Sequence, residues 1–289
     1  MILTTLELLS RLPEELNVRI SRSSETDIDV YVGEMRKHGA LLFQFLDYCS
    51  QQAQQQSSNS VSNQILRQVY YCVDSYVYFL GVDQTVLNQT SMLAKLFQTV
   101  STSSGYLYES AVDTLITIIR CMDVNLEREV NFVAASSVLG AGIQLANHFD
   151  PDNLDEEIVR GHVRIFCEMG ESMCPLFARN IQNAEMRTNL DTLLAILLKC
   201  MDLDAEVAVL TLTFWFKFVD DVLNYNYNFV DVYMSQLNDL IGKCVVLLKY
   251  PDDIGNVHEF LEENDNFEGN RSAILDLLED ICRLIGKYD

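Results

Sequence analysis

The chain has 289 residues, with 42 Asp and Glu against 20 Lys and Arg, so its formal net charge is −22. This charge argues against nucleic acid and anionic membranes as ligands, because both require a cationic surface, and it favours basic protein partners. Hydrophobic residues make up 49% of the chain, which is ample for a core. The small numbers of Pro (4) and Gly (12) disfavour an all-β fold with many tight turns.

Apolar residues recur at helical spacing along nearly the whole chain. The clearest stripe is Ile274, Leu277, Leu278 and Ile281, at positions i, i+3, i+4 and i+7, with charged residues between them. No run shows the strict period of two that is typical of strands, so the sequence predicts an all-α chain. The predicted helices span 2–12, 26–51, 63–80, 84–100, 105–122, 125–149, 153–181, 188–201, 204–224, 228–249 and 270–287.

These helices read as successive pairs with short breaks between them. The first helix of each pair starts near 26, 84, 125, 188 and 228, and two of the four spacings match the roughly 40–47 residues of HEAT and armadillo repeats. We therefore predict an α-solenoid superhelix of antiparallel HEAT-type helix pairs. It forms a single domain over 1–289, with a leading half repeat over 1–12 and about five pairs after it. A lone leading half repeat suggests a piece of a longer solenoid.

Two polar segments interrupt the pattern, and both are predicted to be mobile loops. Residues 51–63 are rich in Gln, Ser and Asn. Residues 251–268, called the acidic segment below, contain seven acids and no Lys or Arg. We expect the acidic segment, together with the pair Asp220 and Asp221, to form an electrostatic surface for basic partners. The predicted partner-binding residues are Asp220, Asp221, Asp252, Asp253, Glu259, Glu262, Glu263, Asp265 and Glu268.

Motifs with catalytic spacing are missing from the sequence. It has no phosphate-binding glycine loop, no nucleophile elbow and no H-E-x-x-H, and its eight cysteines form no C-x-x-C pair. The sequence therefore predicts no enzyme activity, no metal and no cofactor. One alternative is a helical Mg²⁺-dependent enzyme built on Asp220 and Asp221, although Asn224 stands where D-D-x-x-D would place a third carboxylate. The aromatic run around Trp215 is typical of a helix core.

Three blocks of the sequence resemble one protein family. The run Leu210–Phe218 (LTLTFWFKF) resembles an aromatic helix of nuclear transport receptors in the importin-β superfamily, in its transportin-SR and importin-13 branch. Leu8–Glu15 (LLSRLPEE) is similar to a leucine-rich helix of that branch. Phe267–Arg271 and the helix that follows are similar to its acidic loop and next helix. The blocks occur in the family's order with similar spacing, so the resemblance spans essentially the whole chain.

The resemblance implies a superhelix of HEAT repeats whose inner face holds cargo. It also implies that the receptor binds basic cargo proteins, such as arginine-serine-rich splicing factors, and contacts nuclear pore proteins. The receptor would exchange cargo against Ran-GTP and shuttle between cytoplasm and nucleus. In the family the main Ran-gripping repeats precede the leucine-rich helix, whereas only seven residues precede Leu8 here. We therefore expect a middle segment of a longer receptor or the product of a truncated gene model. A generic HEAT scaffold in another assembly is the other reading.

Overall fold

A computed structural model describes residues 2–20, 25–55, 60–80, 90–122, 129–223, 229–250, 264 and 266–286. These residues are overwhelmingly helical and include no β-strand, so the predicted all-α class is confirmed. Within the described ranges, no helix has both the length and the apolar character needed to cross a membrane. The chain divides into two compact units, Met1–Ile165 (unit 1) and Phe166–Asp289 (unit 2).

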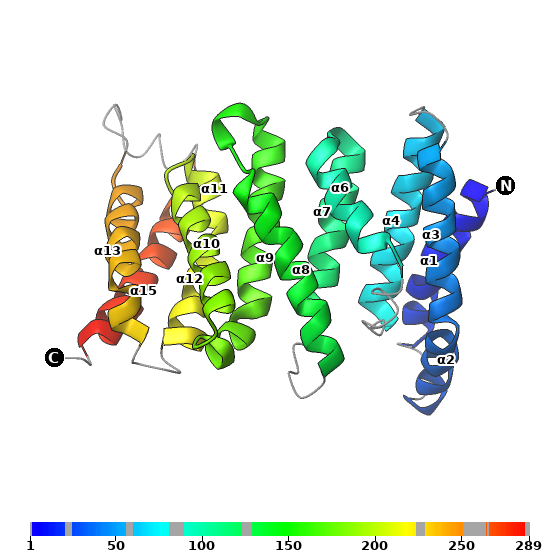
Figure 1. Ribbon diagram of the computed structural model, residues 1–289, viewed down its shortest axis with the longest axis horizontal. Coiled ribbons are helices and arrows are strands. Elements are labelled where there is room, and N and C mark those ends of the chain that lie inside the picture. Colours follow the sequence, from blue (N-terminus) through cyan, green and yellow to red (C-terminus); the bar gives the residue numbers. More distant parts are fainter. Residues whose placement is uncertain are drawn as a thin grey trace. The chain divides into compact units, whose positions relative to one another are not determined.

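Unit 1 is a stack of helix pairs in two layers (Figure 1). Its elements are α1 (Ile2–Ile20), α2 (Glu25–Lys37), α3 (Gly39–Gln55), α4 (Ser60–Leu80), α6 (Met92–Thr102), α7 (Gly105–Arg120), α8 (Glu129–Asn147), the 3₁₀ helix η1 (Pro151–Asn153) and the first part of α9 (Glu156–Asn180). α1, α4 and α7 pack in series in one layer, and α6 packs against α8 in the other. α3 pairs with α4 and α6 with α7 across the layers, as expected for HEAT-type repeats.

Unit 2 continues the same construction. Its elements are the remainder of α9, α10 (Ala184–Cys200), α11 (Ala205–Leu210), α12 (Leu212–Lys217), the π-helical turn η2 (Phe218–Leu223), α13 (Val230–Leu247) and α15 (Phe267–Gly286). α10 packs against α13 in one layer, α12 and η2 pack against α15 in the other, and α13 pairs with α15. α11, α12 and η2 together therefore act as the second helix of one pair.

Aromatic side chains from α12, η2 and α13 form the centre of the unit 2 core. Phe214, Trp215, Phe218 and Tyr233 are fully buried, which confirms the prediction that the aromatic run is core. Their neighbouring ring centroids lie between 5.1 and 6.0 Å apart. Aromatic pairs at such distances contribute about 0.5–1.5 kcal/mol each beyond the burial of their area. This cluster therefore fixes the helices that carry the candidate site.

The first helix is longer than predicted. α1 runs through Pro13 to Ile20 rather than ending at residue 12, although a proline inside a helix costs about 3 kcal/mol. Packing against α4 offsets this cost. The side chain of Gln68 donates to the Ser10 hydroxyl at 2.8 Å, and the Cys72 thiol donates to the carbonyl of Leu6 at 3.1 Å. The predicted leading half repeat thus packs directly on the next pair.

Other boundaries also differ from the prediction for local reasons. The predicted helix over 26–51 is divided at His38, where Gly39 lowers helix propensity. α3 reaches Gln55, because its last turn is rich in Gln, a good helix former, and α4 begins at Ser60. Helices therefore extend into both ends of the predicted 51–63 loop. The prediction of one continuous solenoid over residues 1–289 stays a prediction.

The predicted helix over 204–224 is likewise divided, into α11, α12 and η2. At the first break the buried Thr211 hydroxyl donates to the carbonyl of Ala208 at 2.7 Å, and the Thr211 N–H bonds to the same carbonyl at 3.1 Å. Short polar side chains that bond the backbone in this way compete with regular helix bonds. α10 begins four residues earlier than predicted, since the Asn183 side chain caps it by accepting from the N–H of Glu185 at 2.9 Å.

Gly170 lies where α9 meets the aromatic core of unit 2, so a substitution there tests how tightly this core is packed. A Cβ on Gly170 would stand 2.2 Å from Cδ2 of the fully buried Phe214 ring. We predict that Gly170→Ala lowers the free energy of unfolding by about 1–3 kcal/mol, measured by urea denaturation, because the ring has no free space to enter.

Gly242→Ala in α13 is the matched control for this prediction. No atom lies within 4 Å of the Cβ that it would add. It should stabilise the chain by about 0.5–1 kcal/mol through higher helix propensity. Equal unfolding midpoints for the two variants would contradict the packing account.

Candidate partner-binding surface

The predicted partner-binding residues fall into three groups in the structure. Asp220 and Asp221 lie on η2, and Glu268 lies in the first turn of α15, which begins at Phe267 rather than at 270 as predicted. Glu268 is therefore helical and not part of a loop. The other six predicted residues lie outside the described residues: Asp252, Asp253, Glu259, Glu262, Glu263 and Asp265.

Tyr250 and the first turn of α15 meet in a cluster that joins the two ends of the acidic segment. Arg271 Nη1 donates to Glu268 Oε1 at 3.0 Å and to the Tyr250 hydroxyl oxygen at 2.8 Å. The Tyr250 hydroxyl in turn donates to the same Glu268 oxygen at 2.9 Å. We call Tyr250, Phe267, Glu268 and Arg271 the Arg271 cluster. Through it, residues 18 positions apart are held within hydrogen-bonding distance.

Aromatic rings support the same guanidinium. Its central carbon lies 4.6 Å from the ring centroid of Tyr250 and 5.7 Å from that of Phe267. The two rings are themselves 5.2 Å apart. Contacts between a cation and an exposed aromatic ring contribute about 0.5–1 kcal/mol each. Arg271 is therefore held by a carboxylate, a phenol and two ring faces at once.

The ionisation of Tyr250 and Glu268 reflects this arrangement. The hydrogen bond from the Tyr250 hydroxyl lowers the pKa of Glu268, and the neighbouring Arg271 lowers it further. The pKa of Tyr250 is raised, first because its hydroxyl must keep its proton to donate to Glu268. Near neutral pH Glu268 is thus a carboxylate whose charge is already engaged within the chain.

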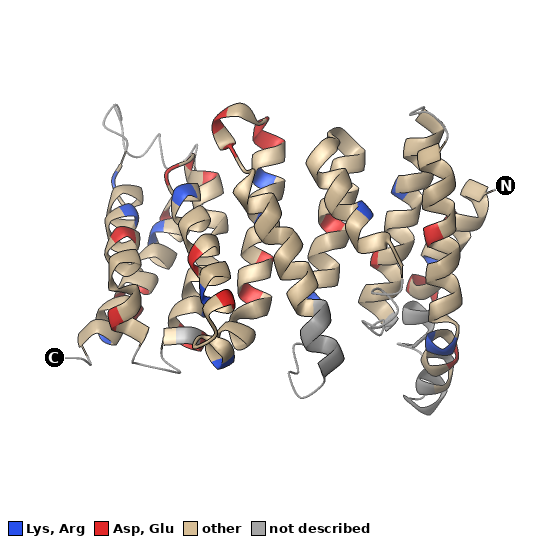
Figure 2. Ribbon diagram, in the orientation of Figure 1, with Lys and Arg blue, Asp and Glu red and all other residues tan. Residues whose placement is uncertain are grey.

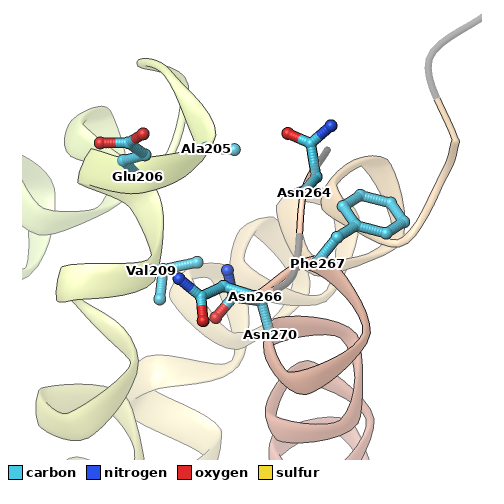
Figure 3. A pocket seen from close by; sticks show the side chains of 7 residues that line it. All are labelled: Ala205, Glu206, Val209, Asn264, Asn266, Phe267 and Asn270. Atoms are coloured by element: carbon cyan, nitrogen blue, oxygen red, sulfur yellow. The ribbon is translucent and has the colours of Figure 1, made fainter. Parts of the chain in front are cut away.

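A groove of about 580 Å³ lies beside this cluster, between α11 and the start of α15 (Figure 3). It is lined by Ala205, Glu206, Val209, Asn264, Asn266, Phe267 and Asn270. Figure 3 shows Glu206 on the α11 side, and the amides of Asn266 and Asn270 directed toward Val209. The Glu206 carboxylate accepts hydrogen bonds, and each asparagine amide both accepts and donates them, so the wall offers acceptors to the N–H groups of a partner. Phe267 belongs both to the groove and to the Arg271 cluster.

Asp220 and Asp221 lie away from the groove, at the other end of the same second-layer helix. Fourteen residues separate Glu206 from Asp220, which corresponds to about 20 Å along a helix. Asp221 pairs with Lys217 at 3.3 Å, and both side chains are about half exposed. The structure therefore does not bring this aspartate pair together with Glu268. It places two separate acidic positions on unit 2.

The balance of charge in unit 2 favours cationic partners. Residues 166–289 contain 9 Lys and Arg against 22 Asp and Glu, a net charge of −13. Figure 2 marks the acidic positions of the described helices in red. In the part of the chain that the structure describes, no three His, Cys, Asp or Glu side chains gather as they would around a metal ion. The absence of a metal and of enzyme activity stays a prediction.

Sequence reasoning did not find Tyr250, Asn270, Glu206 or the role of Arg271. Tyr250 follows the end of α13, and Arg271 lies 21 residues later, so only the fold shows that they touch. The one available signal was the absence of Lys and Arg over 251–268, which makes Arg271 the first cation after a long acidic stretch.

Comparison with known proteins points to one group of receptors. The family model "Exportin 1-like protein" matches residues 1–115, and the model "Transportin-3/Importin-13 second TPR domain" matches residues 154–246. The chain is 25% identical to the mRNA transport regulator MTR10 of Saccharomyces cerevisiae, over 97% of this chain and 29% of that protein. The solved structure titled "Importin13 cytosolic state" superposes with a TM-score of 0.76 at 18% identity, covering 96% of this chain and 34% of the other.

The likeness to importin-13 assigns the fold to the α-solenoids of HEAT-type repeats, as predicted. The matched proteins bear out the resemblance of this chain to the importin-β superfamily, in its transportin-SR and importin-13 branch. It spans about a third of the length of the relatives that it matches.

The contacts in the Arg271 cluster predict that the ionisation of Tyr250 depends on Glu268. In Glu268→Gln, the pKa of Tyr250 should fall toward its ordinary value, because the carboxylate that accepts the Tyr250 hydrogen bond, and whose charge also disfavours the phenolate, is replaced by a neutral amide. The measurement is an NMR titration of ring-labelled tyrosine, with Tyr250→Phe to assign the signal. Glu279→Gln, on the same helix and paired with Arg283, is the control and should leave Tyr250 unchanged. An unshifted Tyr250 in Glu268→Gln would show that the two groups do not interact.

Proposed function

We propose that this chain is part of a nuclear transport receptor that binds basic protein cargo and takes part in Ran-GTP-regulated passage through the nuclear pore. Similarity to proteins of the importin-β superfamily supports the receptor role. MTR10 is named as an mRNA transport regulator, which agrees with a role in transport. Arginine-serine-rich splicing factors are the cargo class that we propose. The receptor would bind nuclear pore proteins and shuttle between cytoplasm and nucleus.

The acidic segment carries this proposal, because it begins and ends at the Arg271 cluster beside a groove that is lined by one carboxylate and three amides. The described residues nearest to it in the chain are Tyr250 before it and Asn264 and Asn266 near its end, and both asparagines line the groove. A basic partner attracted by the acidic segment would therefore reach the groove wall, where Glu206 and the amides accept hydrogen bonds. We assign Asp252, Asp253, Glu259, Glu262, Glu263 and Asp265 to this contact.

The remaining predicted residues take lesser or separate roles. Glu268 already bonds Arg271 and Tyr250, so its carboxylate contributes less to a partner than an uncommitted acid would. Asp220 and Asp221 form a second contact about 20 Å along the same helix, which suits an extended partner rather than a compact one. No metal, cofactor or catalytic step enters this function.

The magnitude of surface electrostatics determines what the acidic segment does. An exposed ion pair contributes only about 0–1 kcal/mol, so no single acid fixes affinity. Many like charges together raise the association rate and make it sensitive to salt. We therefore assign the acidic segment mainly to capture of the partner and the groove to retention.

Neutralising the acidic segment tests this function. In the variant with Asp252→Asn, Asp253→Asn, Glu262→Gln, Glu263→Gln and Asp265→Asn, affinity for a basic cargo protein should fall about tenfold at low salt. The salt dependence of the association rate should also decrease. Stopped-flow fluorescence at low and physiological salt measures both, and Ran-GTP is tested in parallel.

The control neutralises five acids elsewhere on unit 2, so that the net charge changes equally. Suitable positions on α10, α13 and α15 are Glu185, Asp231, Asp239, Asp276 and Glu279. If the charge of the acidic segment acts locally, this control keeps most of the affinity. Equal losses in both variants would mean that only total charge matters, and unchanged binding in the first variant would leave the acidic segment as a solubilising surface.

A further inference from the structure

We propose that a groove between α6 and α8 of unit 1 binds a segment of a basic partner in which an apolar side chain stands next to arginine or lysine. The apolar side chain would enter the groove, and the cations would meet a turn rich in acids at its end. This inference rests on the proposed function, because the partner is a basic protein, and it adds a contact in unit 1 to the one assigned to unit 2.

The α6–α8 groove lies between one face of each helix and has a volume of about 650 Å³. Both faces follow the spacing i, i+3, i+4 and i+7, which places four residues on one side of a helix. These are Ala94, Phe97, Gln98 and Ser101 on α6, and Ala141, Gln144, Leu145 and His148 on α8 and directly after it. The rest of the lining is Val100, Ser103, Leu154, Ile158 and His162. The volume is typical of binding clefts, which measure roughly 300–1,000 Å³.

The lining is apolar where it is buried and polar where it is exposed. Phe97 is buried, and Leu154 and Ile158 are half-buried. Gln98 and Gln144 are exposed, and their amides both donate and accept hydrogen bonds. Covering the apolar part with an apolar side chain removes both surfaces from water, while the amides can bond the backbone that carries it. The groove therefore fits an apolar side chain presented by a peptide segment.

Contacts between helices hold one end of the α6–α8 groove in place. Nδ1 of the buried His162 lies 2.8 Å from the carbonyl oxygen of Ile158 and 2.9 Å from the hydroxyl of Tyr108 on α7. The imidazole also stacks with the rings of Phe149 and Tyr108, at centroid distances of 5.7 and 5.9 Å. Burial lowers the pKa of His162, so the imidazole is neutral near neutral pH and does not repel a cation. A site held in this way loses less entropy when a partner binds.

The same end of the groove is strongly acidic. We call residues 150–157, between α8 and the first turn of α9, the acidic turn, because they contain five acids and no Lys or Arg. All five acids are exposed, and Figure 2 shows acidic positions at this turn. Leu154, which lines the groove, belongs to the acidic turn. The Cα atoms of Asp152 and Asp155 therefore lie within about 8 Å of that of Leu154.

Two of the other acids are engaged within the chain. Asp150 accepts a hydrogen bond from the Asn153 amide at 2.6 Å, and Glu156 pairs with Arg160 at 2.8 Å. We therefore assign the contact with a partner's cations to Asp152 and Asp155. An apolar segment flanked by acids would be repelled by this turn, and a segment of cations alone would leave the apolar lining uncovered. The combination of the two surfaces selects an apolar side chain beside cations.

The groove is tested by Ala94→Gln together with Ala141→Gln. These changes fill it from both walls without altering the charge, and Gln is a good helix former. The matched control is Ala184→Gln with Ala195→Gln, at exposed positions of α10. Circular dichroism first checks that helicity and unfolding temperature are unchanged.

The acidic turn is tested by Asp152→Asn together with Asp155→Asn. Asn keeps the ability to cap the start of a helix, so the main loss is charge. The matched control is Glu14→Gln with Glu15→Gln, at exposed positions of α1, which removes the same charge elsewhere on unit 1.

Three labelled peptides of equal length are the probes, with binding measured by fluorescence anisotropy at low and physiological salt. The first has two leucines between arginines, the second has serines in place of the leucines, and the third has serines in place of the arginines. The unchanged chain should bind the leucine–arginine peptide about tenfold more tightly than either of the others. Filling the groove should remove most of its advantage over the serine–arginine peptide. Neutralising the acidic turn should weaken binding of the leucine–arginine peptide about threefold at low salt, and less at physiological salt.

Several results would overturn the inference and leave the proposed function standing, provided that the serine–arginine peptide binds. They are equal binding of the two arginine peptides by the unchanged chain, equal effects of either test variant and its control, and binding of the leucine–serine peptide as tight as that of the leucine–arginine peptide. The last would mean that the groove takes apolar segments whatever their charge. If neither arginine peptide binds at either salt concentration, the proposed function fails, and this inference fails with it.

Discussion

An amphipathic helix cannot bury its apolar face by itself, so it must pack against other helices. The packing of helices in each unit of this chain meets that requirement. The described helices bury their apolar residues against the partner in the same pair and against helices of neighbouring pairs. The core of each unit therefore lies between its two layers of helices. In unit 2 the fully buried rings of Phe214, Trp215, Phe218 and Tyr233 occupy that core. Gly170 provides the space for Phe214, since no larger residue fits there. The helices that carry the candidate surface depend on this packing.

Helical class and pairing follow from periodicity, and for that reason the sequence predicts them well. Ile274, Leu277 and Ile281 are one of many sets of apolar residues with the spacing of a helix rather than of a strand. All three are buried in the structure. Periodicity carries less information about where helices end. Pro13 signals a break that packing against α4 overrides, and the cap at Asn183 moves the start of α10 forward. These outcomes depend on tertiary contacts and local hydrogen bonds that a one-dimensional pattern does not contain.

The candidate surface is only partly predictable for a related reason. Composition shows that residues 251–268 are acidic, but composition does not show which acids are already paired. Glu268 counts as one more acid in the sequence, and in the structure it is bonded to Arg271 and Tyr250. Similarly, Asp220 and Asp221 lie close to Glu206 in the sequence, whereas the rise of the helix carries them to its other end. Contacts between residues 21 positions apart, such as Tyr250 with Arg271, become visible only once the fold is known.

Electrostatics and shape contribute differently to the proposed binding of a basic partner. A net charge of −13 on unit 2 attracts cations from a distance, with little regard to their sequence. Selectivity requires fixed groups at short range, and the groove with Glu206 and its amides offers such groups. Phe267 belongs both to this groove and to the Arg271 cluster.

Hydrogen exchange of the 289-residue chain, with and without a nona-arginine peptide, tests the central claim most directly. The claim is that basic partners bind at the acidic segment and at the groove between α11 and α15. It predicts that the peptide slows amide exchange in residues 205–209 and 251–271, while exchange in α10 and α13 changes little. Protection confined to unit 1, with residues 205–209 and 264–271 unchanged at saturating peptide, would contradict it.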